Sequence, residues 1–392
     1  MGNRGRRRGT RTADRVDSRA MDRVTVHERT PQSETYTLSG ATDRRQPEIQ
    51  SISWKKARGA AVIQYVDGSR FEGGIDDEKR RHGTGVYVMQ SGNSSEGGWV
   101  HGDFEGFGMQ LYAKTGDCHE GMYRKNHRHG TGTYLWANGD KYVGNWRVGK
   151  MHGTGTFFWK NGDWYNGEWK RGMMHGRGKK VCSSGEMVDG VWRQNQVSGW
   201  GVKVYSSGGK YGGHFVKGER EGFGKYEWAD GDSHEGTWHE GRMHGKGVYV
   251  AAGGSLHGTW RSGELNGQGV HYLTCGSVYT GNYKAGERSG VGTLSFASGE
   301  VYEGEWCKGE VQGYGSWSSP DGRKFIGTWV DGFPSGRGIF CSEQDDEESG
   351  NDGENEHTAE ARHTFKVGEF ERGRLLTTGE DPFVIGQVMV PS

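Results

Sequence analysis

The segment NGDWYNGEWKRGMMHGRG, residues 161–178, combines two compositions that rarely occur together. Five of its eighteen residues are glycine, which is typical of a linker, whereas two tryptophans, a tyrosine and two methionines are typical of a core. The whole 392-residue chain shows the same mixture, with 73 glycines, 15 tryptophans and 17 tyrosines. A disordered glycine-rich chain is poor in aromatic residues because it has no packed interior to hold them. We therefore expect an ordered protein whose glycines serve the geometry of the backbone.

A fixed period organises most of the chain. Gly-x-Gly triplets recur every 23 residues, with one interval of 24 and one of 22. They begin at Gly83, Gly106, Gly130, Gly153, Gly176, Gly199, Gly222, Gly245, Gly267, Gly290, Gly313 and Gly336. Between them runs a second motif, aromatic-x-Gly-x-aromatic, as in Tyr165-Asn-Gly167-Glu-Trp169. A period of this length indicates a repeat protein in which each copy packs against its neighbours.

Each copy is predicted to be a β-hairpin. In residues 153–169 two alternating runs flank Asn161-Gly162, and Asn-Gly favours a two-residue type I′ turn. Because side chains alternate along a strand, Tyr165, Gly167 and Trp169 share one face. A glycine between two rings leaves its backbone uncovered, so we expect a ring of the next hairpin to lie flat against it. The rings are predicted to fill a column, and the predicted structural positions of the repeat are Tyr142, Gly144, Trp146, Gly153, Gly155, Tyr165, Gly167, Trp169, Gly176, Gly178, Tyr302, Gly304 and Trp306.

The spacing and the residues of this motif resemble the MORN (membrane occupation and recognition nexus) repeat, and residues 161–178 are a nearly ideal copy. The resemblance covers roughly residues 59–341. It implies an all-β fold, an elongated solenoid-like ribbon of stacked antiparallel β-hairpins with about 12–13 repeats of 23 residues. Strands about 4.8 Å apart would advance such a ribbon by about 9–10 Å per repeat, to about 110–120 Å in all.

The period also sets the expected boundaries. Residues 1–50 have no period, begin with the basic stretch MGNRGRRR and are expected to be disordered, and residues 59–341 form the array. Residues 343–360 hold nine acids and no Lys or Arg, which predicts an acidic disordered loop over 342–362. Within residues 363–392, VGEFERG (367–373) matches the register of VGNWRVG (143–149). These residues would complete a thirteenth hairpin and add a tail; a chance match after an acidic linker is the alternative.

One copy departs from the pattern. The hairpin that begins at Gly176 has Val188 where most copies have tyrosine, and Asn195 replaces the linker glycine. These substitutions predict a local irregularity near residues 183–198.

Composition argues against several classes of protein. The formal net charge is zero, so no global field attracts the chain to nucleic acid. The five cysteines are scattered and form no CxxC pair, which favours a reducing, cytoplasmic setting. No apolar run approaches the roughly 18 residues of a membrane span, and the basic N-terminus lacks the apolar region of a signal peptide.

No arrangement of residues predicts catalysis, a cofactor or a metal. His129, His152, His175 and His244 precede Gly-x-Gly triplets, and copies one repeat apart would be about 9–10 Å from each other, too far to share one zinc ion. The triplets do not extend to a GxGxxG that opens a helix, and no nucleophile elbow, Walker or kinase signature appears. We expect no enzyme activity.

The favoured hypothesis is a non-enzymatic scaffold that spaces protein partners along a rigid ribbon and self-associates, as a dimer. The resemblance extends to MORN proteins of axonemal radial spoke heads and of protist cytoskeletons, which implies a cytoskeletal, ciliary or flagellar location. The alternative is a tether that binds anionic phospholipid, phosphoinositides in particular. Its candidate contacts are Lys170, Arg171, Arg177, Lys179 and Lys180, although solvated loop charges would explain the same residues.

Overall fold

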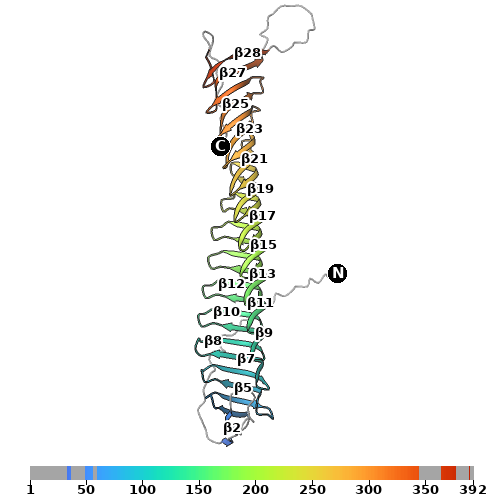
Figure 1. The fold of residues 1–392 in the computed structure, drawn as a ribbon, viewed down its shortest axis with the longest axis vertical. Coiled ribbons are helices and arrows are strands. Elements are labelled where there is room, and N and C mark those ends of the chain that lie inside the picture. The colour runs from blue at the N-terminus through green and yellow to red at the C-terminus, as the bar shows by residue number, and fades with distance from the viewer. Residues whose placement is uncertain (1–32, 37–48, 56–59, 344–362, 377–387, 389–392) are drawn as a thin grey trace, which may run out of the picture. The chain divides into compact units, whose positions relative to one another are not determined.

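The computed structural model describes residues 33–36, 49–55, 60–343, 363–376 and 388, and every regular element in them is a β-strand. The chain divides into an N-terminal unit, Met1–Gly102, and a C-terminal unit, Asp103–Ser392. Within each unit the strands are joined in antiparallel hairpins (Figure 1). The all-β fold of stacked hairpins predicted from the sequence is confirmed.

The N-terminal unit contains two strands that the 23-residue period did not predict. β1 pairs with β2, and β2 pairs with β3 of the first hairpin, so part of the segment expected to be disordered forms strands. The remainder of residues 1–50 lies outside the described residues. The strands of this unit are β1 (Ser33–Tyr36), β2 (Ile49–Lys55), β3 (Ala60–Tyr65), β4 (Arg70–Ile75), β5 (Arg81–Val88) and β6 (Ser94–Val100).

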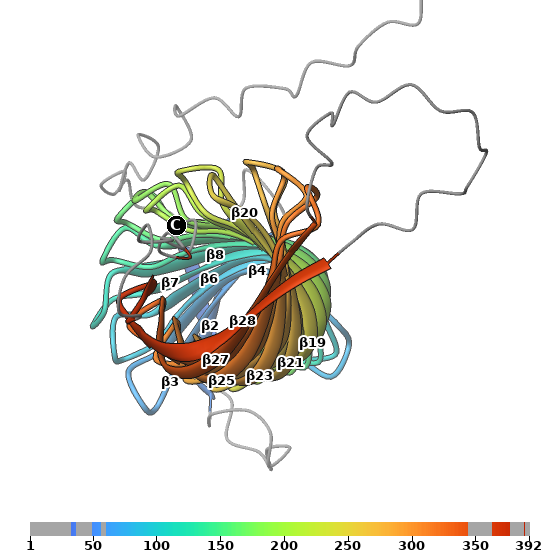
Figure 2. The ribbon, with the colours of Figure 1, turned by 90° about the horizontal axis from the view of Figure 1, so that it is seen from above.

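In the C-terminal unit each strand pairs with the next one along the chain, and the direction of the strands turns progressively through the stack (Figure 2). Its strands are β7 (Asp103–Tyr112), β8 (Asp117–Arg124), β9 (His127–Leu135), β10 (Lys141–Arg147), β11 (Lys150–Phe158), β12 (Trp164–Lys170), β13 (Met173–Val181), β14 (Met187–Arg193), β15 (Gln196–Val204), β16 (Lys210–Val216), β17 (Glu219–Glu227), β18 (Ser233–His239), β19 (Arg242–Ala251), β20 (Gly254–Arg261), β21 (Glu264–Leu273), β22 (Val278–Lys284), β23 (Glu287–Ser295), β24 (Val301–Cys307), β25 (Glu310–Ser318), β26 (Lys324–Val330), β27 (Phe333–Glu343), β28 (His363–Glu371) and β29 (Arg374–Leu375).

Two kinds of turn connect the strands, and the type I′ turn predicted at Asn161-Gly162 does not form there. At Asn161-Gly162 only Gly162 has a positive φ, 92°, and its N–H donates to the carbonyl of Trp159 at 3.0 Å. This pattern fits a three-residue turn with a glycine bulge, not a type I′ turn. Both residues of the linker Val148-Gly149 have positive φ, 49° and 74°, so the type I′ geometry lies in the linkers between repeats.

The first glycine of each triplet sits in a β-bulge. Between β10 and β11, Gly144 lies opposite Gly155 and Trp146 lies opposite Met151. An advance of two residues along β10 therefore matches an advance of four residues along β11. Gly153 lies within this bulge and has a φ of 66°, a conformation that glycine adopts at little cost. The bulge therefore explains why a glycine is needed at this point of every repeat.

In many copies the second glycine of the triplet makes room for a tyrosine, although the ring comes from a different strand than predicted. A Cβ on Gly178 would lie 2.2 Å from Tyr165 Oη, and one on Gly167 would lie 2.5 Å from the same atom. The ring over Gly167 thus belongs to its own strand, β12, and reaches across to the following strand, β13. The expectation that the next hairpin supplies this ring is wrong.

Tyrosine and tryptophan alternate through the core of the C-terminal unit. The Tyr165 ring meets Trp169 of its own strand at 5.2 Å and Trp192 of the next hairpin at 5.4 Å, both edge to face. Trp169 Nε1 donates to the carbonyl of Gly155 at 3.0 Å. Trp146, Trp192, Trp238, Trp306 and Trp329 make the equivalent bond to the second glycine of their own triplets. This face of the sheet, which we call the aromatic face, contains the core.

The hairpin with Val188 keeps the regular geometry. Val188 is buried in the tyrosine position, and β14 and β15 shift register between Gly190 and Trp192 as the other pairs do. Gln194 and Asn195 have φ values of 51° and 68°, so this linker turns like the others. The predicted irregularity near residues 183–198 is wrong, because asparagine adopts the left-handed conformation that glycine adopts elsewhere.

The last hairpin pairs β27 with β28. Gly338 lies opposite Gly368 and Gly336 lies opposite Phe370, which is the pairing that joins β11 to β12. Residues 344–362, which contain most of the expected acidic loop, lie outside the described residues.

Candidate interaction surfaces

The side of the C-terminal sheet that points away from the rings, the opposite face, carries exposed apolar residues. Because side chains alternate, the middle residue of each Gly-x-Gly triplet points to this face. Several of these residues are large, and 53–62 % of their surface is exposed: Phe107, Trp200, Phe223, Val291 and Tyr314. Trp200 also lines a shallow depression together with Met187, Val202 and Val204. Apolar side chains gathered as they are around Trp200 are typical of surfaces that contact another molecule.

A second surface consists of basic residues in the linkers between β8 and β13. The linker sequences 124–129, 147–152 and 170–175 contain Lys, Arg and His and no acid. Six exposed cations, which we call the basic linker edge, lie in or beside the type I′ turns: Arg124, Lys125, Arg147, Lys150, Lys170 and Arg171. Four of them, Arg147, Lys150, Lys170 and Arg171, line one depression. Such an edge attracts anionic groups.

The five residues predicted to contact lipid do not share one surface. Lys170 and Arg171 belong to the basic linker edge. Lys179 lines the same depression as Trp200, and the exposed Arg177 pairs in register with Val191, which places both cations on the opposite face. Lys180 lies on the aromatic face, with its Nζ 5.2 Å from the centre of the Trp159 ring. Within β13, Lys180 lies on a different face from Arg177 and Lys179, since neighbouring residues in a strand point to opposite sides.

The rings predicted to pack in the column are on the aromatic face, whereas a Cβ on Gly153 or Gly176 would meet Asn145 or Glu168 of the opposite face. At most 5 % of the surface of Tyr142, Trp146, Tyr165, Trp169, Tyr302 and Trp306 is exposed. Histidine replaces tyrosine in two copies. His119 and His234 are fully buried, and their rings fill the space above Gly132 and Gly247. Burial lowers the pKa of His234 to about 4, because the surroundings disfavour its charged form.

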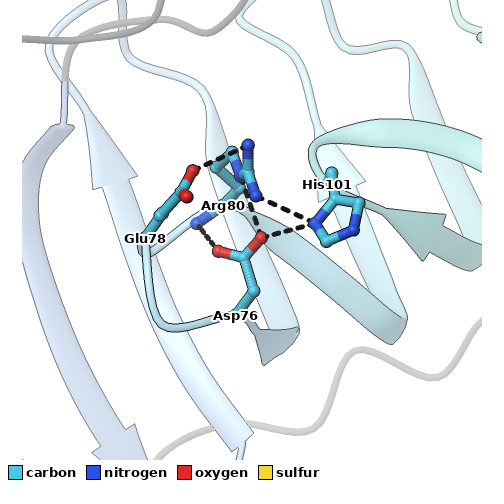
Figure 3. Close-up of polar contacts among 4 residues, drawn as sticks. All are labelled: Asp76, Glu78, Arg80 and His101. Atoms are coloured by element: carbon cyan, nitrogen blue, oxygen red, sulfur yellow. Dashed lines mark hydrogen bonds and ion pairs between the residues drawn. The ribbon is translucent and has the colours of Figure 1, made fainter.

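The N-terminal unit contains a polar cluster that the sequence did not predict (Figure 3). Asp76 follows β4 and His101 follows β6, and the Asp76 Oδ2 lies 3.0 Å from the His101 Nδ1. Arg80 contacts both, with its Nε 2.8 Å from the Asp76 Oδ2 and its Nη2 2.9 Å from the His101 Nδ1. Burial would raise the pKa of Asp76, but hydrogen bonds from His101 and Arg80 outweigh it and lower the pKa to about 2.

The described residues contain no helix with the length and apolar character that a membrane crossing requires. The stacked hairpins and their shared aromatic column define an open β-repeat protein. The MORN repeat model matches at residues 78–94, 96–115, 119–141, 142–164, 165–187, 211–233, 234–256, 257–274, 279–301, 302–322 and 325–345, and the chain therefore belongs to the MORN-repeat family. MORN repeats mediate interactions with proteins or membranes.

Other comparisons add little. No curated protein matches the chain. The TCP domain of SAS-4 from Drosophila melanogaster, in complex with a proline-rich motif of Ana2, is 13 % identical over 45 % of this chain and 95 % of that one, with a TM-score of 0.28. The TCP10 domain of CPAP from Danio rerio, with a STIL peptide, is 9 % identical over 76 % and 98 %, with a TM-score of 0.16. Likenesses at these scores support no functional argument.

Proposed function

We propose that this protein is a non-enzymatic scaffold that holds partner proteins on the opposite face of its C-terminal unit. The observation that carries the proposal is the exposure of large apolar side chains between paired glycines. Trp200 and Phe223 occupy the same position in successive repeats, with 62 % and 53 % of their surfaces exposed. The aromatic face already holds the core, so these rings add little to folding and are available to a partner. Exposed aromatic side chains commonly anchor protein interfaces.

The setting proposed for this scaffold is the cytoskeleton or a cilium. The support is the resemblance of a long repeat array with an acidic segment to radial spoke head and protist cytoskeletal MORN proteins. Fluorescent tagging of the full chain in its native cell tests the setting. A filamentous, basal-body or axonemal signal is expected, and a uniform plasma-membrane signal contradicts it.

Proximity labelling tests the scaffold role itself. The double variant Trp200→Ser and Phe223→Ser should lose a defined set of labelled neighbours while its thermal midpoint stays unchanged. The matched control is Thr131→Ser with Thr154→Ser, which alters the same triplet position in two other repeats. Loss of the same neighbours in the control, or in neither variant, contradicts the proposal.

Self-association is part of the proposal. Tyr314, Ile339 and Val367 line one depression near the C-terminal end of the array, and 43–74 % of their surfaces is exposed. A second copy of the chain would cover these exposed apolar side chains. Sedimentation velocity across a range of concentrations should show a dimer that Val367→Asp weakens. A monomer at every concentration contradicts this part of the account.

A phosphoinositide-binding tether remains the second candidate, because of one observation. Four cations of the basic linker edge line a single depression without an acid among its lining residues. Each basic residue near an anionic membrane surface contributes about 1 kcal/mol of binding free energy, so this edge could hold the protein weakly at a membrane.

A further inference from the structure

Three side chains from separate turns and strands of the N-terminal unit converge on one point. Asp76 follows β4, His82 lies at the start of β5, and His101 follows β6. One oxygen or nitrogen atom from each lies within 4.8 Å of the others, and the two imidazole rings are 5.2 Å apart between centres. The polypeptide fixes this arrangement, since Gly102 N donates to the Arg81 carbonyl at 2.8 Å and Arg81 Nη2 donates to the Gly102 carbonyl at 2.9 Å.

The hydrogen bonds of the cluster do not satisfy all of its atoms. His82 Nδ1 is buried and has no hydrogen-bond partner. His101 Nδ1 lies 3.0 Å from a carboxylate oxygen of Asp76 and 2.9 Å from the guanidinium of Arg80. One ring nitrogen cannot donate to the carboxylate and accept from the guanidinium at the same time. The cluster therefore holds nitrogen and oxygen donors that a positive ion would satisfy better than the present contacts do.

We propose that Asp76, His82 and His101 bind a divalent transition-metal ion, with zinc as the best fit. Two imidazoles and one carboxylate form a common ligand set for Zn²⁺, whereas Mg²⁺ and Ca²⁺ prefer oxygen ligands alone. Tetrahedral zinc with ligand bonds of about 2.0–2.2 Å needs donor atoms about 3.3 Å apart. The Asp76–His101 pair is already close to this spacing, and a ring nitrogen of His82 lies within 4.8 Å of both donor atoms. Water would fill the fourth position.

Arg80 competes with the ion for the same atoms. Its guanidinium contacts Asp76 and His101, and it also reaches Glu78, with 2.7 Å between Arg80 Nη1 and the Glu78 Oε2. When the ion binds, Arg80 keeps Glu78 and releases the other two residues. The ion then ties the turn after β4 to the turn after β6, which stabilises the first two hairpins by an amount that grows with the logarithm of the free metal concentration.

Calorimetric titration of the chelator-treated full chain with Zn²⁺ at neutral pH tests the site. The wild type should bind one zinc ion more tightly than its remaining histidines do. His101→Gln and His82→Gln should weaken this event more than about 100-fold, because loss of even an outer partner of a metal ligand costs about 10–100-fold. His152→Gln, which alters a histidine of the same repeat position in the C-terminal unit, should leave it unchanged.

Arg80→Gln tests the zinc site more sharply than the histidine variants do. It removes the competing charge and should tighten zinc binding severalfold, an effect that damage to the fold would not produce. Co²⁺ should give the intense visible absorption of a tetrahedral site in the wild type and in this variant. Equal zinc binding by the wild type and His101→Gln, or weaker binding by Arg80→Gln, overturns the proposal.

Discussion

The hydroxyl of Tyr165 lies over Gly178 of the following strand and donates to the carbonyl of Glu168 at 3.0 Å. A methyl group on Gly178 would lie 2.2 Å from that hydroxyl, so Gly178→Ala must displace the ring. We expect a loss of about 1–3 kcal/mol of stability, as for overpacking of a core. Gly212 in β16 is the control, because a Cβ there meets nothing within 4 Å.

Gly212→Ala should be neutral or stabilising by about 0.5 kcal/mol, since alanine loses less backbone entropy than glycine on folding. Chemical denaturation of both variants measures the difference. Equal effects at the two glycines would show that the ring does not require the empty space above Gly178.

A buried and an exposed tryptophan, Trp169 and Trp200, should contribute differently to stability. Trp169→Ala removes a buried ring and its bond to the Gly155 carbonyl, and should cost about 3–5 kcal/mol. Trp200→Ala removes a ring with 62 % of its surface exposed and should change the stability by no more than about 0.5 kcal/mol. Thermal melts compare the two. A large loss for Trp200→Ala would assign this ring to folding and not to partner binding.

Val148 is a β-branched residue in a left-handed conformation, with a φ of 49°. This conformation costs most residues about 1–2 kcal/mol, whereas asparagine tolerates it. Val148→Asn should therefore stabilise the protein by about 0.5–1 kcal/mol, as measured by the denaturation midpoint. Val143→Asn in β10 makes the same change in an extended strand, where asparagine is unfavourable, and should destabilise. The same sign at both positions would contradict the assigned turn geometry.

His234 should make the fold sensitive to acid. Its pKa falls from 6.5 to about 4 on folding, so the unfolded chain binds more protons between these values. Stability should therefore be complete above pH 6.5 and decrease as the pH falls towards 4. His234→Tyr restores the residue that other repeats have and should reduce the drop in melting temperature between neutral pH and pH ~5. The exposed His127 is the control position, and an equal reduction for His127→Tyr would refute the assignment.

The period of 23 residues was enough to predict the hairpins, the aromatic face and the glycine positions, because these features repeat in every copy. The strand that supplies the ring over Gly167 could not be predicted. A ring from the same strand and a ring from the next hairpin would both lie next to a glycine. The turn at Asn161-Gly162 was predicted wrongly because Asn-Gly is compatible with a two-residue turn and with the three-residue turn that forms. Strands β1 and β2 were missed because they lie before the first repeat.

The surfaces were harder to predict than the fold. The candidate lipid contacts were chosen for proximity in sequence, and alternation along β13 places Lys179 and Lys180 on different faces. The cluster of Asp76, His82 and His101 combines turns that are 25 residues apart in sequence, so no local motif marks it. Asp76 and His101 follow corresponding strands of successive hairpins, and this spacing in the repeat was the signal that could have predicted the cluster.

Flotation of the full chain with phosphoinositide-containing vesicles at physiological salt separates a protein scaffold from a membrane tether. The comparison needs the charge-reversal variant Lys170→Glu with Arg171→Glu, which alters the basic linker edge alone. If the protein is a scaffold for proteins, the wild type and this variant should both stay unbound, with the vesicles floating free of protein. Flotation of the wild type that the variant abolishes would contradict the scaffold function and establish the tether.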